Sequence, residues 1–120
     1  MAPHQVALFL QIVRDARSNG RLAFRGDRAK NLQALTGLGL RPSDVLDAVA
    51  DLTPEQALGV PRTNEFPRFA HKQVCEFGLD LQETHLYVKV TAGVDEQGSA
   101  GCVISFHPAE SPLRYPFKQR

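Results

Sequence analysis

The chain of 120 residues has no tryptophan, one methionine and only two cysteines. So few cysteines do not suggest a disulfide framework. Both of them, Cys75 and Cys102, fall within apolar runs, which predicts buried free thiols in a reducing cytoplasm. The longest apolar run, 6–10, ends at Gln11 and is far too short to cross a bilayer. We therefore expect a cytoplasmic protein with no membrane partner.

Several familiar catalytic motifs are also missing. The sequence contains no Gly-x-Ser-x-Gly, no phosphate-binding loop and no Gly-x-Gly-x-x-Gly, so acyl transfer and nucleotide binding lose their usual support. Its four histidines lack the close pairings typical of zinc sites: His4, His71, His85 and His107. An enzyme built from this chain is expected to need no metal and no cofactor.

The net charge of +1 hides a strong segregation of charge. Residues 1–43 hold seven Lys or Arg and two acids, residues 44–110 hold four and eleven, and residues 111–120 hold three and none. Basic ends around an acidic middle are compatible with a polyanion bound by the ends. They are equally compatible with a solvated surface that pairs its charges internally.

The N-terminal third of the chain shows the spacing of an amphipathic helix followed by a short strand. Pro3 can open the helix, and Asn19-Gly20 can close it. Its buried face is predicted from four apolar residues at helical spacing: Val6, Phe9, Leu10 and Val13. Residues 22–25 form a short strand candidate.

Two further helices are expected before residue 52. Asp27 can cap a helix that ends at Gly37 and turns two leucines inward, Leu32 and Leu35. Ser43 can begin another that buries Val45, Leu46 and Val49. Residues 53–56, Thr-Pro-Glu-Gln, read as a capping box at the start of a single turn.

The second half of the chain predicts a strand meander. Three strands are expected, over 73–81, 84–92 and 101–107. Three irregular segments are expected as well: a flexible loop over 59–69, a hairpin loop over 93–100 and an irregular tail over 108–120. Helices first and strands afterwards indicate one α+β domain, 1–120, with N-terminal helices on one face of a C-terminal antiparallel sheet.

Alternation along the last two strands predicts two unlike faces. If these strands form a hairpin, the face toward the helices carries Leu86, Val88, Val90, Cys102, Ile104 and Phe106. The opposite face then carries His85, Tyr87, Lys89, Thr91, Ser105 and His107. Cross-strand neighbours on such a face lie about 5 Å apart at Cβ.

The polar face groups side chains that can perform chemistry. Histidine titrates nearest neutrality, so His107, at a strand end before a proline, is the best candidate for a general acid or base. Lys89 can stabilise negative charge on a phosphate, and Tyr87 can orient a substrate or donate a proton. The alternative is an ordinary solvated sheet face, which we weigh most heavily for His85.

A series of short motifs in order then resembles the MqsR family of bacterial type II toxin–antitoxin toxins, which share the RelE-like fold. The resemblance runs from about Arg21 to Phe117. It is carried by Leu38-Gly39-Leu40, Ser43 to Val49, Leu52-Thr53-Pro54-Glu55, Leu86-Tyr87-Val88-Lys89-Val90 and Val103-Ile104-Ser105-Phe106-His107. The longer ending, with Arg114-Tyr115-Pro116-Phe117, indicates a divergent branch.

The resemblance implies an endoribonuclease that cleaves single-stranded mRNA and is neutralised by a cognate antitoxin, often a helix-turn-helix repressor. Tyr87 matches the family's active-site tyrosine, and His107 stands where the family has a lysine. A second family lysine corresponds to Leu58 or Gly59 here, and the family glutamine to Gln73. The hypothetical reaction is attack of a ribose 2′-hydroxyl on the adjacent phosphate.

Several side chains are candidates for contacts with RNA outside the catalytic group. Arg28, Lys30 and Arg114 can contact phosphates, His85 lies on the polar face, and Tyr115 can stack on a base. For the first two the alternative is an exposed helix charge. For Tyr115 the alternative is an anchor for the tail.

Two other classes of function remain open from the sequence. One is a DNA-binding regulatory protein, in which the helices around Gly37 and Ser43 imitate a helix-turn-helix. The acids of the helix 43–51 oppose that reading, because they repel DNA phosphates: Asp44, Asp47 and Asp51. The other is a non-catalytic binding module with a toxin-like fold.

Overall fold

The computed structural model describes residues 3–63 and 72–118. The helices are α1 (His4–Ser18), α2 (Ala29–Leu38), α3 (Pro42–Ala50) and the single 3₁₀ turn η1 (Pro54–Gln56). The strands are β1 (Leu22–Phe24), β2 (Arg62–Thr63), β3 (Lys72–Leu81), β4 (Thr84–Asp95) and β5 (Gly98–Pro108). They form one sheet in the order β1-β5-β4-β3-β2.

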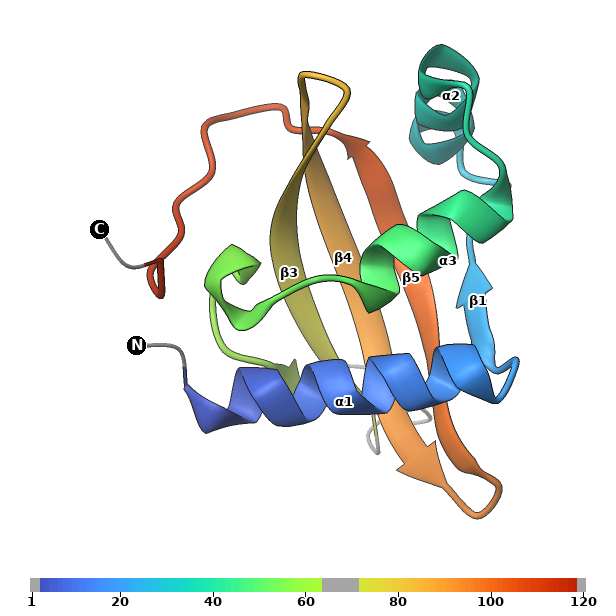
Figure 1. Ribbon diagram of the computed structural model, residues 1–120, viewed down its shortest axis with the longest axis vertical. Coiled ribbons are helices and arrows are strands. Elements are labelled where there is room, and N and C mark those ends of the chain that lie inside the picture. Colours follow the sequence, from blue (N-terminus) through green and yellow to red (C-terminus); the bar gives the residue numbers. More distant parts are fainter. Residues whose placement is uncertain (1–2, 64–71, 119–120) are drawn as a thin grey trace.

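The predicted α+β class is confirmed, with helices packed on one face of a largely antiparallel sheet. Helices α1 and α3 cross the same face, whereas α2 lies beyond it, beside β5 (Figure 1). Only β1 departs from the expected antiparallel arrangement, because it pairs with β5 in parallel. The long connection through α2, α3 and the other strands makes this parallel pairing possible.

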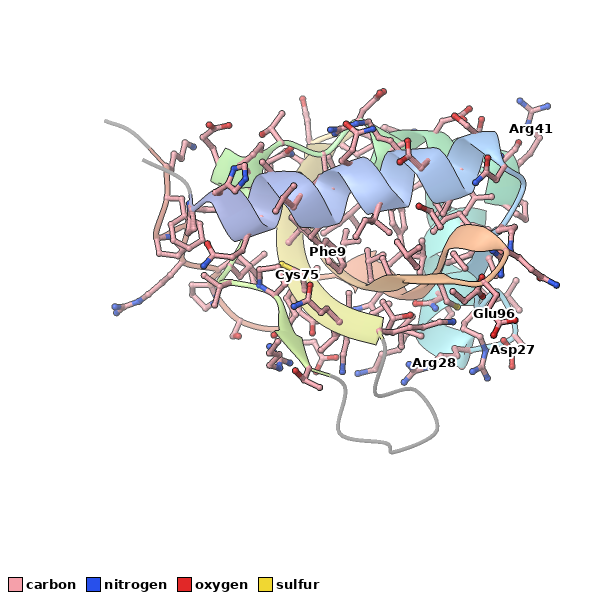
Figure 2. All side chains as sticks on the ribbon, turned by 90° about the horizontal axis from the view of Figure 1, so that it is seen from below. Phe9, Asp27, Arg28, Arg41, Cys75 and Glu96 are labelled. Carbon is pink, nitrogen blue, oxygen red and sulfur yellow. The ribbon has the colours of Figure 1, made fainter. Side chains whose placement is uncertain are left out.

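Helix α1 supplies one side of the core. The four apolar residues predicted from its spacing are all buried, together with Ala16. The ring of Phe9 stacks on Phe77 of β3 with centroids 6.2 Å apart, and Figure 2 shows Phe9 pointing from α1 toward the sheet near Cys75. The helix ends as predicted at Asn19, with Gly20 at φ +73°.

The hairpin of β4 and β5 is longer than predicted. The expected loop over 93–100 is wrong, because strand pairing continues to Asp95 opposite Gly98. Only residues 96 and 97 make the turn. The backbone N–H of Gln97 donates to Asp95 Oδ1, and Gly98 takes a positive φ of +108° that suits such a tight connection.

A β-bulge interrupts the register of this hairpin and corrects one predicted face. Val90 lies opposite Val103 while Lys89 lies opposite Ser105, so Ile104 is the extra residue. Strict alternation had turned Cys102 and Ile104 toward the helices. Instead Val103 joins the core, and Cys102 pairs with Thr91 outside it.

Of the two leucines predicted to face inward from α2, Leu35 is buried as predicted and Leu32 is not. Leu32 is 55% exposed, and Asn31 is 1% exposed in its place. The helix also runs past Gly37 to a C-cap at Gly39, whose φ of +68° suits the left-handed cap. Asp27 does not cap the helix, because its carboxylate pairs with Arg25 and the N-cap is Arg28.

Asn31 closes the edge of β5 beyond the point where β1 ends. Its amide nitrogen donates to the carbonyl of Ile104, and its amide oxygen accepts from the N–H of Phe106, both at 2.9 Å. The same nitrogen also donates to the carbonyl of Arg25. The side chain therefore satisfies backbone groups that a neighbouring strand would otherwise pair.

The other irregular segments divide between confirmed and corrected. Within the expected loop 59–69, residues 62–63 form β2, and 64–71 lie outside the described residues. The capping box of η1 is present as predicted. After Pro108, residues 109–118 form neither helix nor strand, and the tail passes the ends of β4 and β3 (Figure 1).

The tail is held against the sheet by a close approach. Tyr115 lies directly over Gly78 of β3, and a Cβ built on this glycine would come within 1.9 Å of the Tyr115 hydroxyl oxygen. Any larger residue at position 78 would push the ring away. Phe117 packs against the edge of the core.

None of the described helices has the length and apolarity needed to cross a membrane.

We predict that Asn31→Ala lowers the free energy of unfolding by about 2 kcal/mol, because it leaves the buried N–H of Phe106 without its partner. Leu32→Ala, at the neighbouring exposed position, is the matched control and is expected to change it by less than about 0.5 kcal/mol. Urea unfolding measures both. A larger loss for Leu32→Ala would support the inward leucine expected from spacing instead.

Candidate functional site

The sheet face opposite α1, called here the open face, gathers the predicted catalytic residues. Tyr87 and Lys89 of β4 point to it, and so do Ser105 and His107 of β5. In the register, Tyr87 lies opposite His107 and Lys89 lies opposite Ser105. On the other side of β4, Glu76 of β3 lies opposite Lys89. No helix of the described residues covers this face.

Tyr87 and His107, two of the predicted catalytic groups, lie side by side. Their ring centroids are 5.6 Å apart and the rings are tilted by 44°. Both side chains are half-buried. His107 Nδ1 lies 3.0 Å from the carbonyl oxygen of Pro108, so in the neutral ring Nδ1 carries the proton. The basic nitrogen is then Nε2.

Tyr87 is tied to a carboxylate. Its hydroxyl donates to Glu76, which also accepts a hydrogen bond of 2.9 Å from Arg62 of β2. Burial and the neighbouring carboxylate raise the pKa of Tyr87 well above its ordinary value. Partial burial alone would raise the pKa of Glu76, but the hydrogen bonds from Tyr87 and Arg62 outweigh it and lower that pKa. At neutral pH the face therefore presents a protonated phenol and an ionised carboxylate.

Lys89 lies between the two polar neighbours of β4. It is half-buried, with Glu76 on one side and Ser105 on the other. Its charge helps to lower the pKa of Glu76. An anion that entered this part of the face would meet the ammonium group of Lys89, whereas Ser105 beside it is buried.

His85 belongs to a second group at the end of the sheet. Its Nδ1 contacts the carboxylate of Asp80 on β3, and its Nε2 lies 3.2 Å from the Tyr115 hydroxyl. His85 and Tyr115 also meet edge to face, with centroids 6.0 Å apart. Lys118 lies over the Tyr115 ring at 5.7 Å. Tyr115 thus anchors the tail, which is one of the two roles considered for it from the sequence.

The basic residues predicted to bind RNA do not form one cluster. Arg28 donates to the carbonyl of Ile104 at 3.3 Å, and Figure 2 shows it on the side of the sheet away from α1. Lys30 forms an ion pair with Glu110 of the tail. Arg114 is exposed in the tail next to Tyr115. Arg28 and Lys30 flank the β5 end of the open face, and Arg114 follows its other end.

Two functional groups of this face were not assigned from the sequence. Alternation along β3 does turn Glu76 outward, but nothing in its local pattern indicates the bond to Tyr87, eleven residues away. Arg62 lies in a two-residue strand with no periodic signal. Both depend on strand pairing across the sheet.

The positions that correspond to the second lysine and the glutamine of the MqsR family add no ionisable side chain to the open face. Gln73 lies opposite Ala92, on the parity of the core-facing residues of β3, and is exposed at the strand start. Leu58 bonds through its backbone N–H to the carbonyl of Glu76. Neither Leu58 nor Gly59 supplies the cation that the family has there.

The thiols and the histidines complete the inventory of reactive groups. Cys75 and Cys102 are both free; Cys75 is buried as predicted, whereas Cys102 is half-buried. Burial raises the pKa of Cys75 to about 11. Among the described residues, no three His, Cys, Asp or Glu side chains group closely enough to hold a metal ion. His71 lies outside the described part of the chain.

Comparison of the chain with protein-family models finds no match, and neither curated proteins nor solved structures give one. The chemistry of the open face therefore has to be argued from its own geometry.

We predict that Tyr87 stays protonated well above pH 10, because its raised pKa requires a higher pH for ionisation. Tyr115→Phe leaves Tyr87 as the only phenol, since the chain has two tyrosines and no tryptophan. Phenolate absorbance then reports Tyr87 alone. Adding Glu76→Gln should lower the midpoint pH of Tyr87 ionisation, because a carboxylate no longer accepts the hydrogen bond of the phenol. An ordinary midpoint in both variants, with unchanged circular dichroism, contradicts the Tyr87–Glu76 bond.

Proposed function

We propose that the chain is the toxin of a type II toxin–antitoxin system, a metal-independent endoribonuclease that cleaves single-stranded mRNA. One observation carries the proposal: Tyr87, Lys89 and His107 share one sheet face, and Tyr87 lies directly opposite His107. This face offers an imidazole, a cation and a protonated phenol, the three kinds of group that phosphodiester cleavage uses.

The proposed reaction begins at the basic Nε2 of His107. This nitrogen takes the proton of a ribose 2′-hydroxyl, and the 2′-oxygen attacks the adjacent phosphorus. The bond from phosphorus to the 5′-oxygen then breaks, which leaves a 2′,3′-cyclic phosphate. The 5′-oxygen leaves on the side of phosphorus opposite the attacking 2′-oxygen, so a second group, Tyr87, gives it a proton. The imidazolium of His107 then returns its proton to the phenolate through solvent.

The neighbouring groups position and stabilise. Lys89 offsets the negative charge that gathers on the phosphate as the phosphorane forms. Tyr87 is protonated at neutral pH because its pKa is raised, and its hydrogen bond to Glu76 fixes its position. Both properties suit a group that positions the substrate and donates a hydrogen bond. Its raised pKa speaks against a role as general base.

The RNA would cross the open face from one basic edge to the other. Arg28 and Lys30 flank the β5 side, and Arg114 follows the tail on the β3 side. His85 lies two residues from Tyr87 along β4, a distance of about 7 Å. Tyr115 offers a ring edge to a base while its hydroxyl remains on His85. The proposed substrate is cytoplasmic mRNA, and the proposed protein partner is a cognate antitoxin.

We predict that His107→Ala slows RNA cleavage by about two to four orders of magnitude, because it removes the group that transfers the proton. Lys89→Ala is expected to lower kcat through lost charge stabilisation. His4→Ala, an exposed histidine at the start of α1, is the matched control. Gel analysis of a labelled single-stranded RNA measures all three. An unchanged rate for folded His107→Ala removes it from the mechanism.

Expression in a bacterial host tests the biological role. The wild-type chain should arrest growth, and His107→Ala should not, at equal protein level. Co-expression of the neighbouring open reading frame should relieve the arrest if it encodes the antitoxin. Arrest by both forms would favour a non-catalytic module that acts by engaging a partner.

A further inference from the structure

A cleft opens beside His107, between α2 and the ends of β4 and β5. Its volume of about 490 Å³ falls within the range of about 300–1,000 Å³ typical of pockets for small organic ligands. Residues from α2, the two strands and the tail line it: Lys30, Gln33, Ala34, Gly37, Leu38, Thr84, His107, Pro108 and Glu110.

The lining combines apolar and polar side chains. Ala34, Leu38 and Pro108 offer hydrocarbon surface, whereas Gln33 offers an exposed carboxamide with both a donor and an acceptor. A flat ring with hydrogen-bonding edges matches this combination. An unstacked nucleobase has such a ring and such edges.

Gly37 lies on the α2 wall of the cleft. It lies inside α2, where glycine is a poor helix former, and it does not have the positive φ that would require glycine. A Cβ built at this position would meet nothing within 4 Å. Open space therefore lies in front of this glycine, and a side chain longer than that of alanine is needed to fill it.

The mouth of the cleft carries charge suited to a phosphate. Lys30 is bound by the carboxylate of Glu110, so an anion already occupies the position in front of this ammonium. The hydrogen bond and charge of Lys30, and then the charge of His107, lower the pKa of Glu110. An RNA phosphate can replace this carboxylate, because it offers the same anionic oxygens to the same cation.

His107 connects the cleft with the open face, because it lines the one and lies opposite Tyr87 on the other. We propose that the cleft binds one unstacked base of single-stranded RNA, next to the phosphate held at His107. Gln33 then contacts the edge of the base and Lys30 its flanking phosphate. This inference rests on the proposed function, because it takes RNA as the ligand of the same site.

The test measures binding apart from cleavage. Fluorescein-labelled 2′-O-methyl RNA octamers of random sequence lack the attacking hydroxyl, so anisotropy reports affinity alone. Gly37→Leu should fill the cleft and weaken binding about tenfold or more, the effect of losing contact with one base. Gly37→Ala removes the glycine but leaves most of the volume. Thr36→Leu adds the same side chain at a neighbouring exposed position outside the lining.

Both control variants should bind within about twofold of the wild type. Equal binding by Gly37→Leu, or an equal loss in Thr36→Leu, overturns the cleft. A second measurement does not depend on how Gly37→Leu folds: Lys30→Gln should reduce the slope of log affinity against log salt by about 0.7, one phosphate contact on a single strand. An unchanged slope likewise overturns the placement of the phosphate.

The two proposals fail in different ways. If the wild type cleaves natural RNA but its binding does not change on substitution of Gly37 or Lys30, the nuclease proposal is supported and the base-binding cleft is contradicted. If binding depends on position 37 but no RNA is cleaved, the cleft stands and the nuclease falls. A wild type that binds none of the octamers overturns the cleft, and cleavage of natural RNA then decides the nuclease by itself.

Discussion

The arrangement of the open face depends on one extra residue in β5. Val103 and Phe106 are three positions apart, yet both lie in the core. Side chains alternate along a regular strand, so two core residues at an odd spacing require a bulge, and Ile104 supplies it. The bulge therefore keeps two core contacts and also keeps His107 beside Tyr87. In a regular strand, one of the two core contacts or the pairing of His107 with Tyr87 would be lost.

Asn31 has a comparable influence on the position of α2. Its carboxamide takes the place of a strand along β5, which fixes the helix at the sheet edge. Once the helix is fixed there, its residues that line the cleft face the start of β4, the end of β5 and the start of the tail. The cleft beside His107 is the space that remains, and Gly37 leaves it unfilled. One buried polar side chain thus links the stability of the edge to the shape of the site.

The charges of the site are organised by pairing across the sheet. Glu76 is kept ionised by Tyr87 and Arg62, and Tyr87 is kept protonated by burial and by Glu76. The two groups fix each other's protonation state, so neither titrates near neutrality. Lys89 lies beside them as a cation, and the imidazole of His107 is left as the natural proton carrier of the face. This division of roles underlies the proposed cleavage.

The sequence by itself determined the α+β class, the buried stripe of α1 and the outward alternation of Tyr87 and Lys89. These features follow from local periodicity, which each element expresses without reference to the others. The tertiary structure decided the bulge at Ile104, the inward turn of Asn31 and the partners of Tyr87. Each of these depends on which backbone edge or side chain lies opposite, and no local pattern carries that information. The same holds for the cleft, because its walls come from a helix, two strands and the tail.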